Sequence, residues 1–209
     1  MKTTTLGGLA GMVVWLTAMA GAQGVLHVMH GETDYDNLGQ SVAGAGDVNN
    51  DGFDDFIVGV HLDDNNGNSS GSARVMSGRT GSLIVIFNGD SVGDQFGWSV
   101  DGAGDVNGDG HADLIVGAKH DDPNGSASGM ARVLSGKDTS ILYSFAGDSG
   151  GDTFGWSVAG AGDVDADGFA DLIVGANGDD NNGSQVRKRP HPLGPHRRRP
   201  LHIQRGFSG

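Results

Sequence analysis

The sequence repeats itself with a fixed period, and this repeat is the feature that most limits how the chain can fold. An acidic loop begins at Asp47, at Asp105 and at Asp163, so the period is 58 in both intervals. A short apolar run follows every loop, at Phe56–Gly59, Leu114–Gly117 and Leu172–Gly175. A period of this length indicates an array of similar units that pack against one another.

Each period contains four short runs of β-forming residues, separated by Gly, Asn, Asp and Ser. In the second copy these runs are Leu83–Phe87, Trp98–Ala103, Ala112–Ala118 and Met130–Leu134. No window has the apolar spacing of a helix. Four strands in a period of roughly 40–60 residues are typical of a propeller blade. We therefore predict an all-β fold, a partial β-propeller of four-stranded antiparallel blades with under three repeats. A solenoid is the alternative, but the period is long for one coil.

Oxygen-bearing side chains occupy positions 1, 3, 5 and 9 of each acidic loop, and glycine occupies position 6. The oxygen-bearing residues are Asp47, Asn49, Asp51 and Asp55, then Asp105, Asn107, Asp109 and Asp113, then Asp163, Asp165, Asp167 and Asp171. Alternate residues of a tight loop can direct their oxygens to one centre, and calcium takes about 6–8 oxygen ligands. The pattern predicts one Ca²⁺ site in each copy. The third loop has four carboxylates where the others have three, so we expect it to bind calcium most tightly.

The start of each acidic loop also fits two other interpretations. An EF-hand or a dockerin module begins in the same way, but it needs an acidic ligand at position 12 and a helix after the loop. Position 12 is Val58, Val116 or Val174, inside a β-type run, which argues against both modules. Solvated acidic turns without a metal are the remaining alternative.

Three elements of the second copy recur in fixed order: Phe96-Gly97, the loop Asp105–Asp113, and Val116-Gly117-Ala118. Together they resemble an FG-GAP repeat, the blade unit of the β-propeller in integrin α subunits. The resemblance covers Val25 to Ser184. The first copy departs from the motif with Leu38 in place of Phe. No copy has the proline of the motif's name, and family propellers have about seven blades.

The resemblance implies a calcium ion in the loop that joins the first two strands of a blade. It adds the backbone carbonyl of position 7 to the four side-chain ligands. Those carbonyls belong to Phe53, His111 and Phe169. The family also implies recognition of an extracellular protein or carbohydrate on a propeller face.

Residues 1–22 have the pattern of a secretory signal peptide. Lys2 precedes an uncharged apolar run from Leu6 to Ala20, and small residues suited to cleavage follow. The run is broken by glycine and is shorter than the ~20 residues of a membrane span. We predict a secreted protein, extracellular or periplasmic, with no membrane insertion after cleavage. Because the chain has no cysteine, bound metal would take the place of disulfides.

Residues 23–186 form the predicted repeat region, and the composition changes abruptly after it. Residues 187–209 hold seven of the 13 basic residues, whereas all 26 acidic residues lie between Glu32 and Asp180. A basic tail that binds nucleic acid or lipid is one interpretation. We favour a shift of reading frame, because codons for this tail, read one base on, can spell the missing strand and the next blade. On that hypothesis residues 187–209 are disordered, the propeller is truncated, and its open sheet edges favour self-association.

Other features carry weaker signals. Asp63-Asp64, Asp121-Asp122 and Asp179-Asp180 begin glycine-ended turns, so solvated turns are favoured over a second metal site. Trp98 and Trp156 follow the Phe-Gly pairs in phase, which favours blade packing over a platform for sugar. The histidines lack the spacing of a zinc site; they include His27, His30, His61, His111 and His120.

The functional prediction is a non-catalytic calcium-binding module for extracellular adhesion or scaffolding. A net charge of −13 argues against nucleic acid as a partner. The single glutamate and the absence of a Ser-His-Asp, H-E-x-x-H or phosphate-loop pattern argue against an enzyme. The alternatives are an accessory propeller piece of a larger extracellular hydrolase and the non-functional product of a truncated gene.

Overall fold

The computed structural model describes residues 12–19, 22–31 and 35–179, and within these ranges the chain forms strands and no helix. The strands are β1 (Met12–Met19), β2 (Ala22–His30), β3 (Val42–Gly46), β4 (Asp55–Val60), β5 (Ser72–Met76), β6 (Leu83–Asn88), β7 (Phe96–Gly104), β8 (Asp113–Ala118), β9 (Met130–Leu134), β10 (Ile141–Ala146), β11 (Phe154–Gly162) and β12 (Asp171–Ala176). The described part of the chain therefore contains no helix that could cross a membrane.

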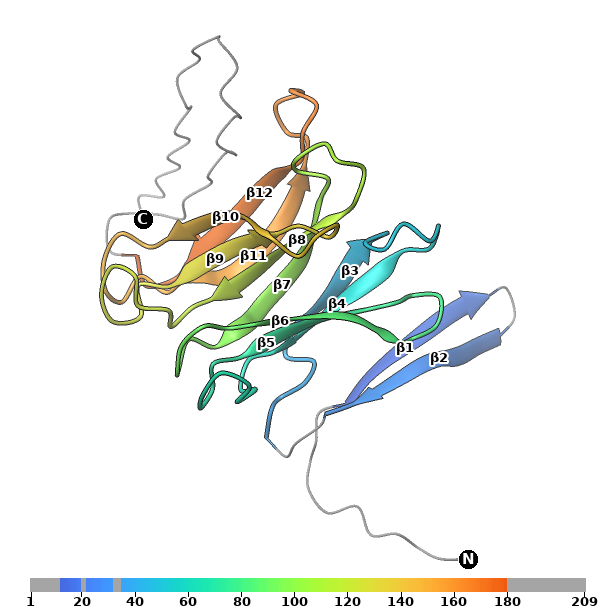
Figure 1. The fold of residues 1–209 in the computed structure, drawn as a ribbon, viewed down its shortest axis with the longest axis horizontal. Coiled ribbons are helices and arrows are strands. Elements are labelled where there is room, and N and C mark those ends of the chain that lie inside the picture. Colours follow the sequence, from blue (N-terminus) through green and yellow to red (C-terminus); the bar gives the residue numbers. More distant parts are fainter. Residues whose placement is uncertain (1–11, 20–21, 32–34, 180–209) are drawn as a thin grey trace, which may run out of the picture.

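Two four-stranded sheets form the body of the protein (Figure 1). Their orders are β3-β4-β5-β6 and β7-β8-β9-β10, and every neighbouring pair is antiparallel. Strands β11 and β12 pair as the beginning of a third such sheet. The prediction of an all-β fold with blade-like antiparallel sheets is confirmed.

The boundaries of the sheets differ from the boundaries of the 58-residue periods in the sequence. Strand β6, the first run of the second period, is the outer strand of the first sheet. The short turn after β5 explains this, because Ser77 N–H donates to Ser82 C=O at 2.8 Å and closes a tight hairpin. A blade therefore begins at the Phe-Gly strand and ends with the first run of the next period.

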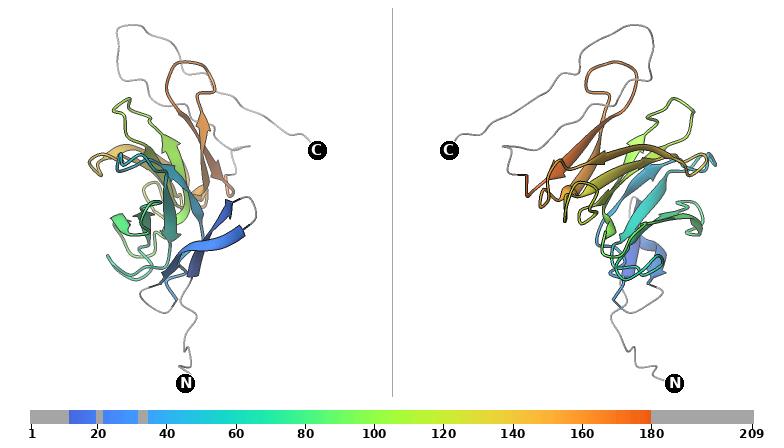
Figure 2. Two further views of the ribbon diagram at one scale, coloured as in Figure 1. Left: turned by 90° about the vertical axis from the view of Figure 1, so that its right-hand side faces the viewer. Right: turned by 60° about the vertical axis from the view of Figure 1, so that its left-hand side comes forward.

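The hydrophobic core lies between the sheets, which stack one behind another (Figure 2). One cluster joins Ile57 and Val75 of the first sheet to Phe96 and Leu114 of the second. A second cluster joins Ile115 of the second sheet to the β11–β12 pair. Because β4 and β8 have neighbouring strands on both sides and packed layers on both faces, all their residues are buried. This explains why both strands are continuous apolar runs.

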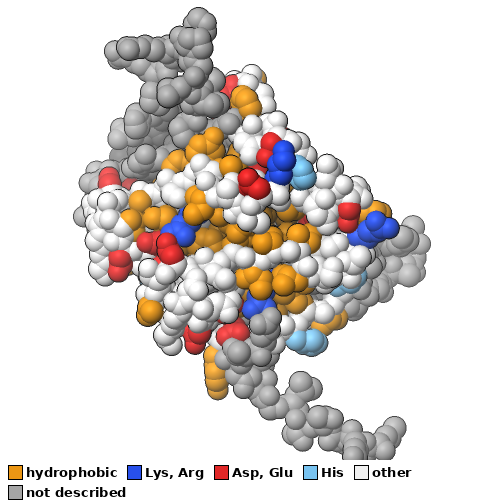
Figure 3. Space-filling model, viewed as in Figure 1, with side chains coloured by type: hydrophobic (Ala, Val, Ile, Leu, Met, Phe, Trp, Pro, Cys, Tyr) orange, Lys and Arg blue, Asp and Glu red, His pale blue; other side chains and the backbone are white. Residues whose placement is uncertain are grey.

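Hydrophobic side chains also gather across the middle of the face shown in Figure 3, with basic and acidic side chains scattered around them. The last strand is less well covered. Strand β12 has Ile173 at 44% exposure, whereas its counterpart Ile115 is fully buried. The difference follows from position, since β11 and β12 lie at one end of the stack and β1 and β2 lie at the other (Figure 1).

The N-terminal hairpin pairs β1 with β2 in antiparallel register. Strand β2 corresponds to β6 and β10 in the repeat, and its Met29 packs against a third cluster that contains Phe56 and Met76 of the first sheet. Strand β1 lies within the predicted signal peptide, and the cleavage of residues 1–22 stays a prediction about processing. The predicted basic tail, residues 187–209, lies outside the described residues.

Candidate metal centres

Each acidic loop connects the first two strands of a sheet, the place that the family resemblance implied. The loops follow β3, β7 and β11 and lead into β4, β8 and β12. In the last two pairs, Gly104 is the partner of Asp113 and Gly162 is the partner of Asp171. Strand pairing therefore brings position 9 of each loop back to the residue just before position 1.

The backbone of the loops turns sharply at two positions. Position 4 has a positive φ of 57° at Asn50, 76° at Gly108 and 57° at Ala166. Position 6 is glycine in all three loops, with φ between 86° and 91°. Other residues rarely adopt this left-handed conformation, which explains the glycine there. The turns bring the backbone N–H of position 5 within hydrogen-bonding distance of the position 1 carboxylate in all three loops.

The carboxylate at position 1 accepts backbone hydrogen bonds from the same loop. Asp163 accepts from the N–H groups of Asp167 at 3.0 Å and Gly168 at 2.9 Å. The same two bonds recur at Asp47 and Asp105. At position 5, one oxygen accepts from the N–H of position 7 in every copy. A carboxylate has about four lone-pair sites, so these bonds leave capacity for a cation.

The carboxylate at position 9 is buried and fixes the loop to the rest of the sheet. Asp113 accepts from Val106 N–H at 2.9 Å and from Gly136 N–H, in the turn after β9, at 3.2 Å. Asp55 makes the equivalent bonds with Val48 and Gly78. Burial raises the pKa of Asp113 to about 6, although the two backbone hydrogen bonds oppose the shift. Burial also raises the pKa of Asp55.

The third loop shows the clearest convergence of oxygens. One carboxylate oxygen from each of Asp163, Asp165 and Asp171 lies within 4.8 Å of the other two. These are positions 1, 3 and 9, while in the first two loops position 3 is an asparagine. A set of carboxylate, amide and carbonyl oxygens on a tight glycine-containing loop fits a hard cation such as Ca²⁺. That the residues at positions 1, 3, 5, 7 and 9 bind calcium stays a prediction.

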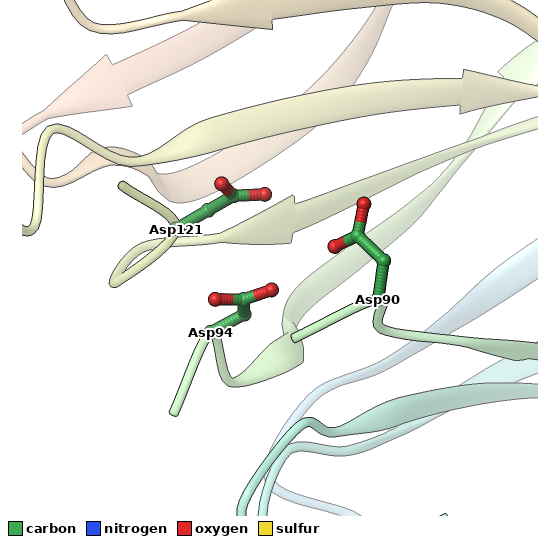
Figure 4. A group of neighbouring side chains, drawn as sticks. All are labelled: Asp90, Asp94 and Asp121. Carbon is green, nitrogen blue, oxygen red and sulfur yellow. The ribbon is translucent and has the colours of Figure 1, made fainter. Parts of the chain in front are cut away.

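A second kind of acidic cluster was not recognised in the sequence. Asp90 and Asp94 precede β7, Asp121 follows β8, and their carboxylates converge (Figure 4). Arg132 of β9 donates to Asp90 at 2.7 Å and to Asp121 at 3.4 Å. Burial and the neighbouring Asp90 raise the pKa of Asp94 to about 7. A guanidinium therefore provides the positive charge of this cluster.

The first sheet has a related ion pair between Arg74 of β5 and Asp63, at 3.1 Å. Asp63 is only 5% exposed, so the expectation that these paired aspartates form solvated turns is wrong for Asp63 and for Asp121. The expectation of a solvated turn is consistent with the second aspartate of each pair, Asp64 or Asp122. Both are exposed and accept a hydrogen bond within their own turn. The signal in the sequence was an arginine in the middle of an apolar strand, which needs an acidic partner when it is buried.

The two in-phase tryptophans contact each other across neighbouring sheets. The ring centroids of Trp98 and Trp156 are 5.3 Å apart. Lys119 Nζ lies 3.1 Å from the Trp98 centroid and 4.6 Å from that of Trp156, and His61 meets Trp98 edge-on. This arrangement favours the interpretation of these rings as packing between blades.

Comparison with known proteins agrees with this architecture. The FG-GAP repeat family matches the chain at residues 38–76, 96–134 and 154–187. Integrin alpha-6 of Gallus gallus is 31% identical over 78% of the chain, and integrin alpha-IIb of Mus musculus is 34% identical over 73%. Integrin alpha-V of Gallus gallus is 34% identical over 70%. The matched part makes up 15%, 16% and 14% of the length of these three relatives.

Proposed function

The chain belongs to the FG-GAP repeat family, and from that premise we propose that it is a calcium-binding module for extracellular adhesion or scaffolding. The observation that carries the proposal is the convergence of Asp163, Asp165 and Asp171 in a loop whose backbone geometry recurs in all three copies. The relatives are integrin alpha subunits, and they supply the adhesion-type context.

Calcium has a structural role in this proposal. Position 9 connects the loop to the turn after the third strand, as Asp113 does with Gly136. A cation bound to positions 1, 3 and 9 would therefore join the start of the hairpin to its end and to that turn. The ion would be surrounded by protein oxygens and would rigidify the loops, with no part in a reaction. The protein would act outside the cytoplasm by binding an extracellular protein or carbohydrate.

Neighbouring loops also contact each other, which supports a common function for them. His111 Nδ1 lies 3.1 Å from the carbonyl oxygen of Val48, so the second loop contacts the first. Val48 and Val106, at position 2, are buried, whereas Val164 of the last loop is 71% exposed. Ordering one loop would help to order the next, and the proposed ions would strengthen one continuous side of the stack.

Isothermal titration of metal-stripped protein with Ca²⁺ tests the proposal. We expect three sites, of which Asp163→Asn removes the third and leaves the other two. Asp138→Asn is the matched control, because Asp138 lies in an exposed turn outside the loops and hydrogen-bonds within that turn. Three unchanged sites in Asp163→Asn, or no calcium binding by the unsubstituted protein, would contradict the proposal.

The third site should bind calcium most tightly, because position 3 is a carboxylate only there. Asp165→Asn converts the third loop to the ligand set of the other two and should lower its affinity to theirs. The reverse change, Asn107→Asp, should raise the affinity of the second loop. Equal affinities before and after both substitutions would show that the fourth carboxylate has no effect.

A further inference from the structure

The second acidic loop differs from the other two in having an asparagine followed directly by glycine. Asn107 occupies position 3 and Gly108 occupies position 4. The first loop has Asn50 at position 4, and the third loop has Asp165 and Ala166 at positions 3 and 4. An Asn-Gly pair readily loses its side-chain amide as ammonia, because glycine has no Cβ to hinder its backbone nitrogen as it approaches the asparagine side chain. Among the three loops, only the second has this pair.

The hydrogen bond made by the glycine N–H distinguishes this pair from the other four Asn-Gly pairs within the described residues. In those four pairs the glycine N–H donates to a backbone carbonyl oxygen at 2.8–3.3 Å; the glycines are Gly67, Gly89, Gly125 and Gly178. Gly108 N–H instead donates to a carboxylate, Asp105 Oδ1, at 2.7 Å. A carboxylate is a base that can take up the proton of this N–H, whereas a backbone carbonyl oxygen is not.

The side chain of Asn107 is held beside the same peptide group. Its Oδ1 accepts from Asp109 N–H at 2.9 Å, and its Nδ2 donates to Asp109 Oδ2 at 3.0 Å. The first bond is that of an Asx turn, which folds the side-chain amide back over the nitrogen of Gly108. By contrast, Asn66 and Asn124 donate to backbone carbonyl oxygens 23 residues away, and these bonds tie their side chains to another segment.

The surroundings of the pair leave room for a reaction that needs water. Gly108 is exposed and Asn107 is half-buried. Gly108 has a positive φ of 76°, and a Cβ added there would lie 3.5 Å from a carbon of the Phe169 ring, an ordinary contact. The equivalent Ala166 has a φ of 57°, so this position of the loop accepts alanine.

We propose that Asn107 is a site of spontaneous deamidation, with the Asp105 carboxylate as the proton acceptor. The nitrogen of Gly108 forms a bond to Cγ of Asn107 while its proton passes to Asp105. The bond between Cγ and Nδ2 then breaks, and the amide leaves as ammonia, which takes up that proton. Water opens the resulting cyclic imide at either carbonyl and leaves aspartate or isoaspartate, so the net change replaces NH₂ with OH.

The two products change the proposed calcium site in opposite directions. Aspartate at position 3 gives the second loop the four carboxylates of the third, which favours calcium. Isoaspartate adds a CH₂ group to the backbone and displaces the ligands that follow. Bound calcium engages the oxygens of Asp105 and Asn107 and should slow the reaction. These effects on and of calcium rest on the proposed function, whereas the deamidation itself does not.

Peptide mapping by mass spectrometry tests the proposal after incubation of the full chain in chelator at mildly alkaline pH. The other described pairs are references in the same digest: Asn66, Asn88, Asn124 and Asn177. We expect Asn107 to react faster than all four. Asp105→Asn should slow the reaction about tenfold or more, because a positioned base contributes at least this factor. Asp105→Glu keeps the carboxylate and should retain more of the rate.

Gly108→Ala provides a second variant that preserves the loop, because alanine is the natural residue at this position of the third loop. The added methyl group should hinder the attack on Asn107 and slow it as strongly as Asp105→Asn does. A rate at Asn107 no higher than at the reference pairs would overturn the proposal. So would a rate that is unchanged in Gly108→Ala, or one that is equal in Asp105→Asn and Asp105→Glu.

Repeating the incubation in Ca²⁺ separates this inference from the proposed function. At a hundredfold excess over the dissociation constant, the rate at Asn107 should fall by up to about a hundredfold, because only the free loop reacts. Fast deamidation that calcium does not slow would support the reaction at Asn107 and contradict calcium binding by the second loop. Slow deamidation in chelator, together with normal calcium titration, would overturn the inference and leave the proposed function standing.

Discussion

The aspartate at position 9 combines two roles that the other loop carboxylates do not share. Asp113 is buried, accepts hydrogen bonds from Val106 and Gly136, and lies close enough to Asp109 and Asp105 for their charges to contribute to its raised pKa. At position 5, by comparison, a carboxylate oxygen accepts from the N–H of position 7 within the same loop. Position 9 therefore supports the sheet even before any metal is bound.

The variant Asp113→Ala separates these two roles. It leaves the buried N–H of Val106 without its acceptor, so we expect the free energy of unfolding in chelator to fall by about 1–3 kcal/mol. Asp109→Asn, in the same loop, should weaken calcium binding and leave the metal-free stability close to that of the unsubstituted protein. Urea denaturation in chelator measures both. Equal stabilities of the two variants would contradict the structural role of position 9.

The acidic cluster beside Arg132 predicts a pH dependence of stability. Burial and Asp90 raise the pKa of Asp94 to about 7 from an ordinary value of 3.8, so the folded protein binds this proton more tightly than the unfolded chain. The stabilisation is fully present below about pH 4 and is lost as the pH rises to about 7. Asp94→Asn should remove this slope and be more stable than the unsubstituted protein at about pH 8.

Urea denaturation across this pH range measures the effect, with the exposed Asp138→Asn as the control. Asp113 also has a raised pKa, but it titrates in both proteins and its contribution cancels in the comparison. If the unsubstituted protein and Asp94→Asn show the same dependence on pH, Asp94 does not titrate in the way that its surroundings indicate.

At the scale of elements, the motif glycines allow neighbouring blades to approach each other closely. A side chain at Gly59 would collide with the carbonyl oxygen of Gly97, and one at Gly117 with that of Gly155. Gly97 and Gly155 also have positive φ, 85° and 83°. The glycine after the phenylalanine and the glycine of the apolar run thus pack on each other across adjacent sheets.

The variant Gly117→Ala tests this contact. We expect it to lower the free energy of unfolding by about 1–3 kcal/mol, because the added methyl group meets backbone that cannot move aside easily. Gly175→Ala is the matched control one repeat later, where the added group meets the hydroxyl of Ser157 and no backbone atom closer than 3.7 Å. Thermal unfolding compares the two. A larger loss in Gly175→Ala would show that the contact between sheets is not the cause.

Strand positions followed from the sequence because turn residues and β-branched runs alternate clearly. The assignment of β6 to the first sheet could not be predicted, because the sequence of a repeat does not show where one sheet ends and the next begins. The hairpin closed by Ser77 and Ser82 decides it, and hairpin closure depends on a backbone bond that composition does not reveal. The ion pairs of Arg74 and Arg132 were missed because their aspartates also have the pattern of a surface turn.

At the scale of the whole molecule, the protein is a stack of sheets whose acidic loops contact one another, and 39 of its 209 residues are glycine. The loop ligands were predictable because they are local in sequence, all within one short segment of each repeat. The small pocket lined by Asp148, Phe154 and Asp179 was not predictable, because these residues are distant in the sequence and only the packing of three strands brings them together.

The central claim is that calcium binds these loops and stabilises the stack, and thermal unfolding with and without calcium tests it most directly. Metal-stripped protein is melted in chelator and again in excess Ca²⁺, and its bound metal is measured by elemental analysis. Each site filled at a hundredfold excess over its dissociation constant should add about 2.7 kcal/mol, so the melting temperature should rise clearly. Identical melting in both conditions, with no calcium retained, would contradict the account.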